Sequence, residues 1–593
     1  MNNFYIFIIL VTVLFSRTAT AESIDMIQEV MKSAEKGIAT SQYELGVIYA
    51  KGEFSKQDYG EAIKWYQLAA IQGNANAQKE LGLIYYKGLG GKQDYAEGFK
   101  WTRLAAELGL AKAQYNLGLL YFEGKGTQQD LLESIKWYKR AAKQGDIDAL
   151  NNLGWMYDNG KGVVQDFEEA IRWYRIAAEK GDSEAQYRLG NAYEYGQGIR
   201  LDIDDSAKWY KASAKQGNPL AQKALGIMYQ NGKGVKQDYA EAIRWYRIAI
   251  DHGNNDSQWL LGVMYEKGLG VIQNYEEAAK LYQVSAEKGS ATAQYLLGLL
   301  YENNHGVKQN YSAAVKLYQL ATDQGNARAM YSLGRMYESG FGVEKNMSSA
   351  MKWYKLSAIN GDGVAQAYIA VKYDNGAGVA QNHDEAIKWY RLAAEQGVAL
   401  AQFNLGVIYS NGIWVIKNNK EALRLYKLAA AQGYANAMCN LGVLYQNGID
   451  VSRDNDEALQ WYKEAARYGN GTAMFNIGGI YQNGIGVRKD AAEALKWYKL
   501  AANQGVIKAQ KNLGAMYQQG IDVYKDNAEA AKWYKLAAGQ GDDSAQCQIG
   551  WMYDTGTGVM INKTIAIKWY KLAAAQGNLI AIKNLSALNK RAN

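Results

Sequence analysis

One feature constrains the fold of this chain more than any other: a 36-residue pattern that repeats without an insertion or deletion. Steps of 36 residues from Trp65 reach a Trp or a Leu fifteen times in succession. The anchors are Trp65, Trp101, Trp137, Trp173, Trp209, Trp245, Leu281, Leu317, Trp353, Trp389, Leu425, Trp461, Trp497, Trp533 and Trp569. A period of this size is typical of a solenoid, in which one supersecondary unit stacks on the next.

The first half of each copy predicts an amphipathic helix, here named helix A. In one copy, Ala77, Leu81 and Tyr85 recur with the spacing of one helix face. Gly88 then follows, and the same slot holds Gly in every copy except one, which has Asn304. Gly and Asn are the residues that best adopt positive φ. We therefore interpret this slot as a backbone requirement at the end of helix A, not as a phosphate-binding loop.

The second half of each copy predicts another helix, named helix B. The slot of Asp94 holds Asp or Asn in every copy, and both side chains can accept from the free N–H groups at a helix start. Interchange of Asp and Asn favours capping, because a general acid or base would not survive loss of its charge. The slot of Gly109 is Gly in all copies and predicts the end of helix B.

The combined motif AxAQxxLGxxYxxGxGVxxDxxxAxxWYxxAAxxG closely resembles the Sel1-like repeat, a relative of the tetratricopeptide-type helical solenoids. The resemblance implies an antiparallel helix pair per repeat, a right-handed superhelix, and helix A on the concave face. We therefore predict an all-α, right-handed superhelical solenoid of about fifteen 36-residue antiparallel helix pairs.

The ends of the chain predict a leader and two caps. Residues 1–21 read as a secretory signal, with an apolar run too short to span a bilayer and the small-x-small site Ala19–Ala21. The first three residues, MNN, carry no Lys or Arg ahead of the apolar run, which leaves an uncleaved anchor as an alternative. Residues 22–36 predict an N-terminal cap helix, 37–576 the repeats, and 577–593 a C-terminal cap helix. We expect a secreted or periplasmic protein of a bacterial envelope, with no transmembrane segment after cleavage.

The sequence offers little for catalysis, cofactors or metals. His252, His305 and His383 fall at different phases of the repeat, and no HExxH, CxxC or GxSxG motif occurs. Cys439 and Cys547 lie three repeats apart, so we expect two free thiols. The net charge of +7 is spread over the helices without the basic stripe that nucleic acid needs. We predict no enzyme, no cofactor, no metal and no nucleic-acid partner.

Three rows of helix A lie about 180° from the Leu/Tyr stripe and predict a surface directed away from the core. The first row is aromatic, the second apolar, and the third acidic in the middle of the chain, with Asp158 and Asp374 among its members. The candidate ligand-binding residues are Tyr187, Trp259, Tyr295, Tyr331 and Phe403 in the first row, Val263 and Leu299 in the second, and Glu194, Glu266, Glu302 and Glu338 in the third. The alternative is that neighbouring A helices approach closely and bury these residues.

These rows favour a non-catalytic scaffold that binds a protein or peptide segment, notably one carrying Lys or Arg. The alternatives are a cell-wall or carbohydrate binder, and an envelope hydrolase. Some cysteine-rich members of the resembled family are assigned β-lactamase activity, but their paired cysteines are absent here. The most irregular stretch is 367–416, where Ala370 replaces Gly, Lys372 enters an apolar slot and Trp414 replaces a loop Gly. We interpret it as a local change of curvature or a contact specific to these repeats.

Overall fold

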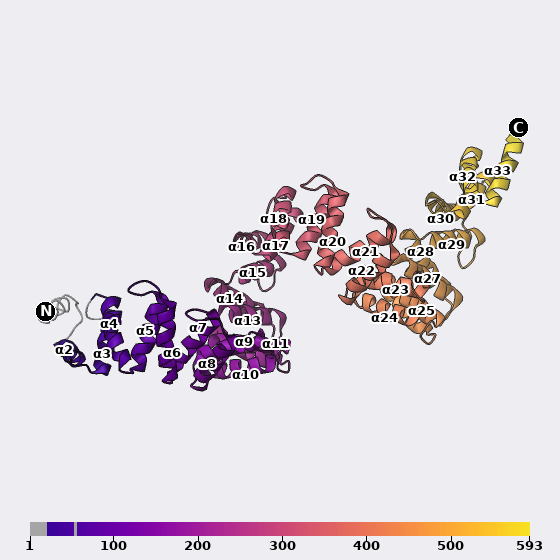
Figure 1. The fold of residues 1–593 in the computed structure, drawn as a ribbon. Coiled ribbons are helices and arrows are strands. Elements are labelled where there is room, and N and C mark those ends of the chain that lie inside the picture. Colours follow the sequence, from indigo (N-terminus) through magenta and orange to yellow (C-terminus); the bar gives the residue numbers. More distant parts are fainter. Residues whose placement is uncertain (1–20, 53–55, 593) are drawn as a thin grey trace. The chain divides into compact units, whose positions relative to one another are not determined.

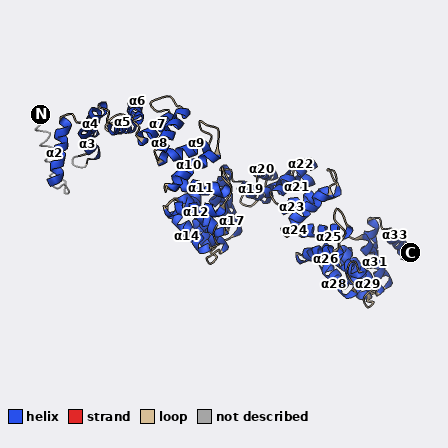
Figure 2. Cartoon of the chain, turned by 90° about the horizontal axis from the view of Figure 1, so that it is seen from below, coloured by secondary structure: helices blue, strands red, loops and turns tan. Residues whose placement is uncertain are grey.

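The computed structural model describes residues 21–52 and 56–592, and side chains within 26–52 and 56–588. The described residues form helices joined by short loops, and none of them forms a strand (Figure 2). Nearly all of the predicted signal, residues 1–20, lies outside the described part.

Helices of two kinds alternate along the chain (Figure 1). The A helices are α3 (Ala39–Lys51), α5 (Ala75–Lys87), α7 (Ala111–Glu123), α9 (Ile147–Asp158), α11 (Ser183–Tyr195), α13 (Pro219–Asn231), α15 (Asn255–Lys267), α17 (Ala291–Asn303), α19 (Ala327–Ser339), α21 (Gly363–Asn375), α23 (Ala399–Asn411), α25 (Ala435–Asn447), α27 (Gly471–Asn483), α29 (Ile507–Gln519), α31 (Asp543–Thr555) and α33 (Leu579–Ala592).

The B helices are α2 (Ala21–Glu35), α4 (Tyr59–Ile71), α6 (Tyr95–Glu107), α8 (Leu131–Lys143), α10 (Phe167–Glu179), α12 (Ile203–Lys215), α14 (Tyr239–Asp251), α16 (Tyr275–Glu287), α18 (Tyr311–Asp323), α20 (Met347–Ile359), α22 (His383–Glu395), α24 (Asn419–Ala431), α26 (Asn455–Arg467), α28 (Ala491–Asn503), α30 (Asn527–Gly539) and α32 (Lys563–Ala575).

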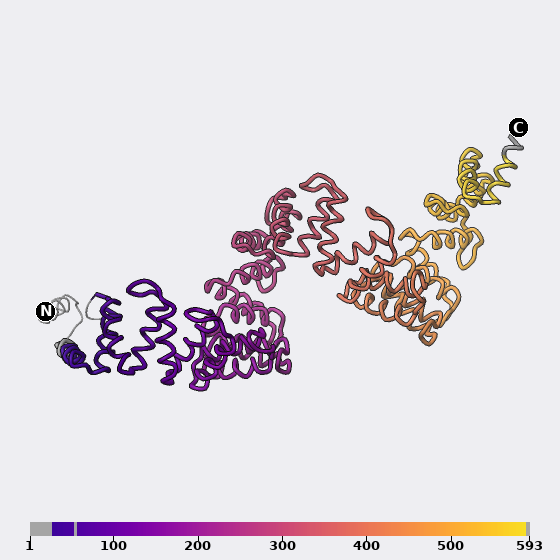
Figure 3. Tube along the Cα trace, viewed as in Figure 1, coloured from indigo at the N-terminus to yellow at the C-terminus, as the bar shows by residue number. Residues whose placement is uncertain are grey.

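The chain divides into two compact units within α17. The first holds residues up to Ala293 together with His305–Val307, and the second holds Gln294–Asn304 and the residues from Lys308 onward. In each unit, consecutive helices pack against each other, as α5 and α6 do in the first and α19 and α20 in the second, so that hairpin follows hairpin (Figure 3). The all-α solenoid of paired helices predicted from the sequence is confirmed.

The helix ends follow the predicted backbone requirements. Asp94 caps α6 by accepting from the N–H groups of Ala96 and Glu97, and Asn418 caps α24 in the same way. Gly88 ends α5 with a φ of 69°, and Asn304 takes a φ of 60° in the one copy that lacks the glycine. The interpretation of these two slots as capping and turn positions is confirmed.

A tyrosine of the B helix forms the centre of the hairpin in every repeat except that of α6, where Thr102 takes its place. Tyr210, Tyr318 and Tyr354 are among the largest fully buried side chains, and the ring of each lies against the helical glycine of its own repeat. A Cβ atom at Gly190 would lie 2.7 Å from Tyr210 Cδ1, which is closer than real Cβ contacts come. Glycine in the Leu-Gly pair of helix A therefore makes room for the tyrosine ring of helix B.

In most repeats, a buried glutamine lies at the junction with the repeat before it. In α23, the side chain of Gln402 donates to the carbonyl of Ala394 on the preceding B helix, at 3.2 Å. Its oxygen accepts from Gln432, at the end of its own B helix, at 2.9 Å. The glutamines of this slot are Gln42, Gln78, Gln114, Gln186, Gln222, Gln258, Gln294, Gln366, Gln402, Gln510 and Gln546. The slot is the Gln of the AxAQ motif, to which sequence reasoning assigned no role.

Candidate functional site

The candidate site is the set of three helix-A rows, and its third row faces the protein's own tyrosines. The hydroxyl of Tyr210 donates to Glu194 at 2.8 Å, and that of Tyr282 donates to Glu266 at 2.5 Å. Tyr318 and Tyr354 donate to Glu302 and Glu338, each at 2.6 Å. Each tyrosine lies sixteen residues after its acceptor, on the B helix of the same repeat.

These hydrogen bonds change the interpretation of the acidic row. The helical angle predicted side chains directed away from the core, yet Glu302 is only 7% exposed and the other three carboxylates are half-buried. Burial, together with the carboxylate acceptor, raises the pKa of each of these tyrosines above its ordinary value. The acidic row therefore serves first as the acceptor for buried phenols.

Amides replace the carboxylates in other repeats without loss of the hydrogen bond. Gln230 accepts from Tyr246 at 2.6 Å, and Gln446 accepts from Tyr462 at 2.8 Å. An amide oxygen therefore accepts this hydrogen bond as well as a carboxylate does, and the negative charge is not needed for it. The constant spacing of sixteen residues between this row and the buried tyrosine was the sequence signal for the pairing.

The first row packs beside the same tyrosines. The ring centroids of Tyr187 and Tyr210 lie 5.8 Å apart, and those of Tyr331 and Tyr354 lie 5.4 Å apart. Tyr187 and Glu194 thus contact one buried tyrosine from two sides. Tyr295 and Phe403 make the equivalent contacts with Tyr318 and Tyr426, and Trp259 donates to Asp256 at 3.4 Å.

The candidate side chains of the first and second rows are neither fully buried nor fully exposed to solvent. All first-row candidates are half-buried, and so are Val263 and Leu299 of the second row. The side chains therefore combine a fixed inner edge, held by the hairpin, with an outer edge that solvent reaches. Rigid aromatic side chains with one free edge are suited to contact with another molecule, because little side-chain entropy is lost on binding.

Charge differs along the acidic row. Glu302 pairs with Arg335 at 2.9 Å, and Glu338 pairs with Lys372 at 2.8 Å, in each case across to the next A helix. Glu194 and Glu266 form no ion pair with a Lys or Arg of the described residues. The uncompensated charge of the candidate site therefore lies at Glu194 and Glu266, both in the first unit.

The irregular stretch contains contacts specific to its repeats. Lys372 occupies a slot that other repeats fill with apolar residues, and its ammonium also lies 5.0 Å from the centroid of the Tyr368 ring. Trp414 takes a φ of 58°, and its ring stacks on that of His383 with centroids 3.5 Å apart.

The two cysteines are free, and the described residues include neither a group placed to hold a metal ion nor a helix that could span a membrane. Cys439 and Cys547 are free and buried, as expected, and burial raises the pKa of Cys439 to about 11. Within residues 21–52 and 56–592, no group of three His, Cys, Asp or Glu side chains is placed to hold a metal ion. In the same part of the chain, no helix combines the length and apolar character that a membrane span requires.

Stacked helical hairpins with a shared packing scheme define this chain as an α-solenoid repeat protein. The family model described as Sel1 repeat matches fifteen consecutive segments: 39–74, 75–110, 111–146, 147–182, 183–218, 219–254, 255–290, 291–326, 327–362, 363–398, 399–434, 435–470, 471–506, 507–542 and 543–578. The chain belongs to the Sel1 repeat family. Proteins of this family are generally protein-interaction scaffolds and typically non-enzymatic.

Two solved structures illustrate the relationship. A protective antigen with an SLR fold, present in uropathogenic Escherichia coli strains, is 34% identical and covers 82% of this chain and 97% of its own, with a TM-score of 0.44. A Sel1 repeat protein from Oxalobacter formigenes is 30% identical and covers 56% of this chain and 93% of its own, with a TM-score of 0.43. A comparison with curated proteins finds no match.

Proposed function

We propose that this chain is a secreted or periplasmic, non-catalytic scaffold that binds a protein segment along the helix-A rows. The observation that carries the proposal is the series of half-buried aromatic side chains, each packed against a buried tyrosine and partly exposed to solvent. Anchors of this kind, repeated at the period of the hairpins, would contact an extended partner at several points.

The charge of the site specifies the partner further. Glu194 and Glu266 keep a carboxylate without a cationic neighbour, whereas Glu302 and Glu338 are already neutralised by Arg335 and Lys372. A partner segment carrying Lys or Arg would therefore gain most in the first unit. Such rim charges act mainly on the association rate and on its dependence on salt.

The test uses the double variant Glu194→Gln and Glu266→Gln. Gln keeps the acceptor for Tyr210 and Tyr282, as Gln230 does for Tyr246, and removes only the charge. Affinity capture of the mature chain from envelope and host extracts first identifies the partner by mass spectrometry. We then expect the variant to bind that partner about tenfold more weakly, which corresponds to 1.4 kcal/mol.

The matched control is Glu179→Gln with Glu395→Gln, which removes the same two charges from exposed positions of B helices. Circular dichroism should show equal helix content for the wild type and both variants. Equal affinity of all three proteins would exclude the acidic row from the interface. Hydrolysis of a β-lactam by the purified chain would contradict the non-catalytic role.

The proposed location has its own test, because the predicted signal lies outside the described residues. Intact-mass measurement of the protein recovered from the periplasm or medium should give a chain that begins at Glu22. Recovery of the full-length chain in the membrane fraction would instead support an uncleaved anchor.

A further inference from the structure

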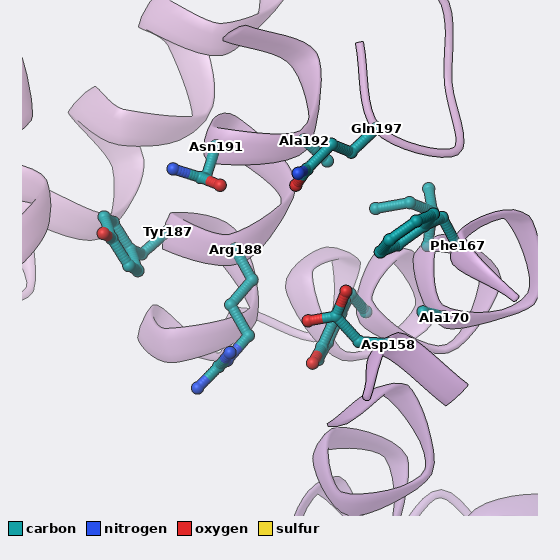
Figure 4. A pocket seen from close by; sticks show the side chains of 10 residues that line it. Asp158, Phe167, Ala170, Tyr187, Arg188, Asn191, Ala192 and Gln197 are labelled. Carbon is teal, nitrogen blue, oxygen red and sulfur yellow. The ribbon is translucent and has the colours of Figure 1, made fainter. Parts of the chain in front are cut away.

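A cavity of about 180 Å³ opens between two consecutive repeats of the first unit, and none of the packing described above accounts for it. Its lining comes from three successive helices: the end of α9, the inner face of α10 and the middle of α11 (Figure 4). Asp158, Tyr174, Arg188, Asn191 and, from the loop after α11, Gln197 supply its polar lining, and Phe167, Ile171 and Ala192 supply an apolar wall.

The cavity contains a buried phenol with no hydrogen bond. Tyr174 is 2% exposed, and its buried hydroxyl makes no hydrogen bond of ordinary geometry, although the Arg188 guanidinium lies close enough to oppose the rise that burial causes in its pKa. In the next repeat, the equivalent Tyr210 donates to Glu194 at 2.8 Å. Asp158 occupies the slot of Glu194 but is one methylene shorter, and it makes no hydrogen bond with Tyr174. An unpaired buried hydroxyl destabilises the folded state, and an occupant of the cavity that accepts from it removes that cost.

Two opposite charges face the same space without forming an ion pair. The guanidinium of Arg188 lies 5.5 Å from the centroid of the Tyr174 ring and pairs with Glu184 at 2.8 Å, which leaves other N–H donors of the fork free. Burial raises the pKa of the Asp158 carboxyl, and the positive charge of Arg188 opposes that rise. Figure 4 shows the Asp158 and Arg188 side chains at the cavity.

This combination selects the chemistry of the occupant. A ligand with only a carboxylate would be repelled by Asp158, and a ligand with only an ammonium would leave the Tyr174 hydroxyl and the free N–H groups of Arg188 without an acceptor. A zwitterion satisfies both, and its carboxylate can also accept from the orphaned hydroxyl of Tyr174. The apolar wall formed by Phe167, Ile171 and Ala192 has room for a short hydrocarbon side chain.

We propose that this cavity binds a free α-amino acid with an apolar side chain, its ammonium on Asp158 and its carboxylate on Tyr174 and Arg188. The site lies at the edge of the helix-A rows, since Tyr187 also lines it. The site does not require the protein partner proposed above, because two consecutive repeats of this chain supply all of its lining residues.

The experiment uses the mature chain and L-leucine, observed by saturation-transfer difference NMR and by the melting temperature. L-leucine should show saturation transfer, and N-acetyl-L-leucinamide, which lacks both charges, should show none. Tyr174→Phe and Asp158→Asn should each weaken binding at least tenfold. Tyr246→Phe is the control, because Gln230 already accepts from that hydroxyl in a repeat outside the cavity.

The variant Asp158→Glu tests whether L-leucine binds in this cavity or at another site. The added methylene should bring the carboxylate to the Tyr174 hydroxyl, as in the pair of Glu194 and Tyr210, and should fill the space. We expect this variant to lose L-leucine binding and to melt at a higher temperature than the wild type. Absence of saturation transfer to the wild type would mean that the cavity holds water only, and undiminished binding by Asp158→Glu would place the ligand elsewhere. Either result overturns the proposal.

Discussion

The ammonium of Lys372 donates a hydrogen bond of 2.8 Å to the carboxylate of Glu338 on the preceding A helix. Tyr354 and Tyr368 donate to the same carboxylate at 2.6 and 2.7 Å. Partial burial raises the pKa of Glu338, but the three donors outweigh burial and lower it to about 2. Two repeats of the second unit are therefore joined through one ionised group.

This pairing predicts a dependence of stability on pH. The folded-state pKa of Glu338 lies below its ordinary value of 4.5, so the ionised form stabilises the folded state. Its contribution should be complete above pH 4.5 and should be lost as the pH falls toward 2. Urea unfolding of the wild type and Glu338→Gln across this range should show a difference in unfolding free energy that shrinks on acidification. A difference that stays constant with pH would exclude this role, and Glu179→Gln is the exposed control.

The helical glycines predict a steric effect that depends on position. A Cβ atom at Gly298 would lie 2.6 Å from Tyr318 Cε1, so Gly298→Ala should displace the ring and weaken its hydrogen bond to Glu302. Overpacking of this kind costs about 1–3 kcal/mol. Gly539→Ala is the matched control, because its Cβ would meet nothing within 4 Å. Equal unfolding free energies for the two variants would contradict this explanation.

One repeat already carries the alanine, but its acceptor is Asp in place of Glu, so this repeat does not isolate the effect of the Cβ atom. Ala370 stands in the glycine slot, and the hydrogen bond from Tyr390 to Asp374 there is 3.5 Å long, compared with 2.6 Å for Tyr318 and Glu302. The shorter side chain of Asp374 contributes to the same lengthening. Asn404 supplies a further contact to the Tyr390 hydroxyl at 3.3 Å.

The buried glutamines predict a loss that is concentrated at one junction. Gln402→Ala should remove both of its hydrogen bonds and leave a space between α22 and α23, at a cost of about 1–3 kcal/mol. Gln402→Met should cost less, because Met330, Met438 and Met474 occupy the same slot in other repeats. Hydrogen exchange should show faster opening of the turn at Gly397 for the Ala variant. Unchanged exchange there would show that the glutamine does not hold the junction.

The helix caps predict that an amide can replace a carboxylate but that a methyl group cannot. Asp454 accepts from the backbone N–H of Glu457 at 2.9 Å at the start of α26. Asp454→Ala should cost about 0.5–2 kcal/mol, whereas Asp454→Asn should be nearly neutral. Denaturant unfolding measures both. If Asn proved as harmful as Ala, the negative charge and not the cap would be the important property.

The sequence predicted the features of the fold that depend on a single position. A turn glycine such as Gly88 and a cap such as Asp94 satisfy local backbone requirements. Because the period is strict, the same few residue types recur at these positions in every repeat and can be recognised in the sequence. The pairing of helices followed from the same period. The role of Gly190 was not predicted, because the ring that it accommodates belongs to a helix twenty residues further on.

The candidate site was harder to predict than the fold. The helical angle placed Glu302 on the outer side of α17, but a tyrosine is long enough to reach around the hairpin and bring that carboxylate into a buried hydrogen bond. The cavity at Asp158 depends on one missing methylene and on an arginine at position 188 where several repeats have Asn. Such features depend on side chains from three helices together, so they cannot be recognised from any single position of the sequence.

The stack of Trp414 on His383 has a consequence for assembly of the chain. Repeats with the same glutamine and tyrosine contacts offer nearly equivalent docking faces, so a nascent chain could skip one hairpin and still satisfy most of its pairings. The indole on the imidazole and the ion pair between Lys372 and Glu338 occur at one junction each among those described, and a skipped hairpin forfeits them. These two contacts, each found at one described junction, distinguish the correct neighbouring repeat from the other, nearly equivalent repeats.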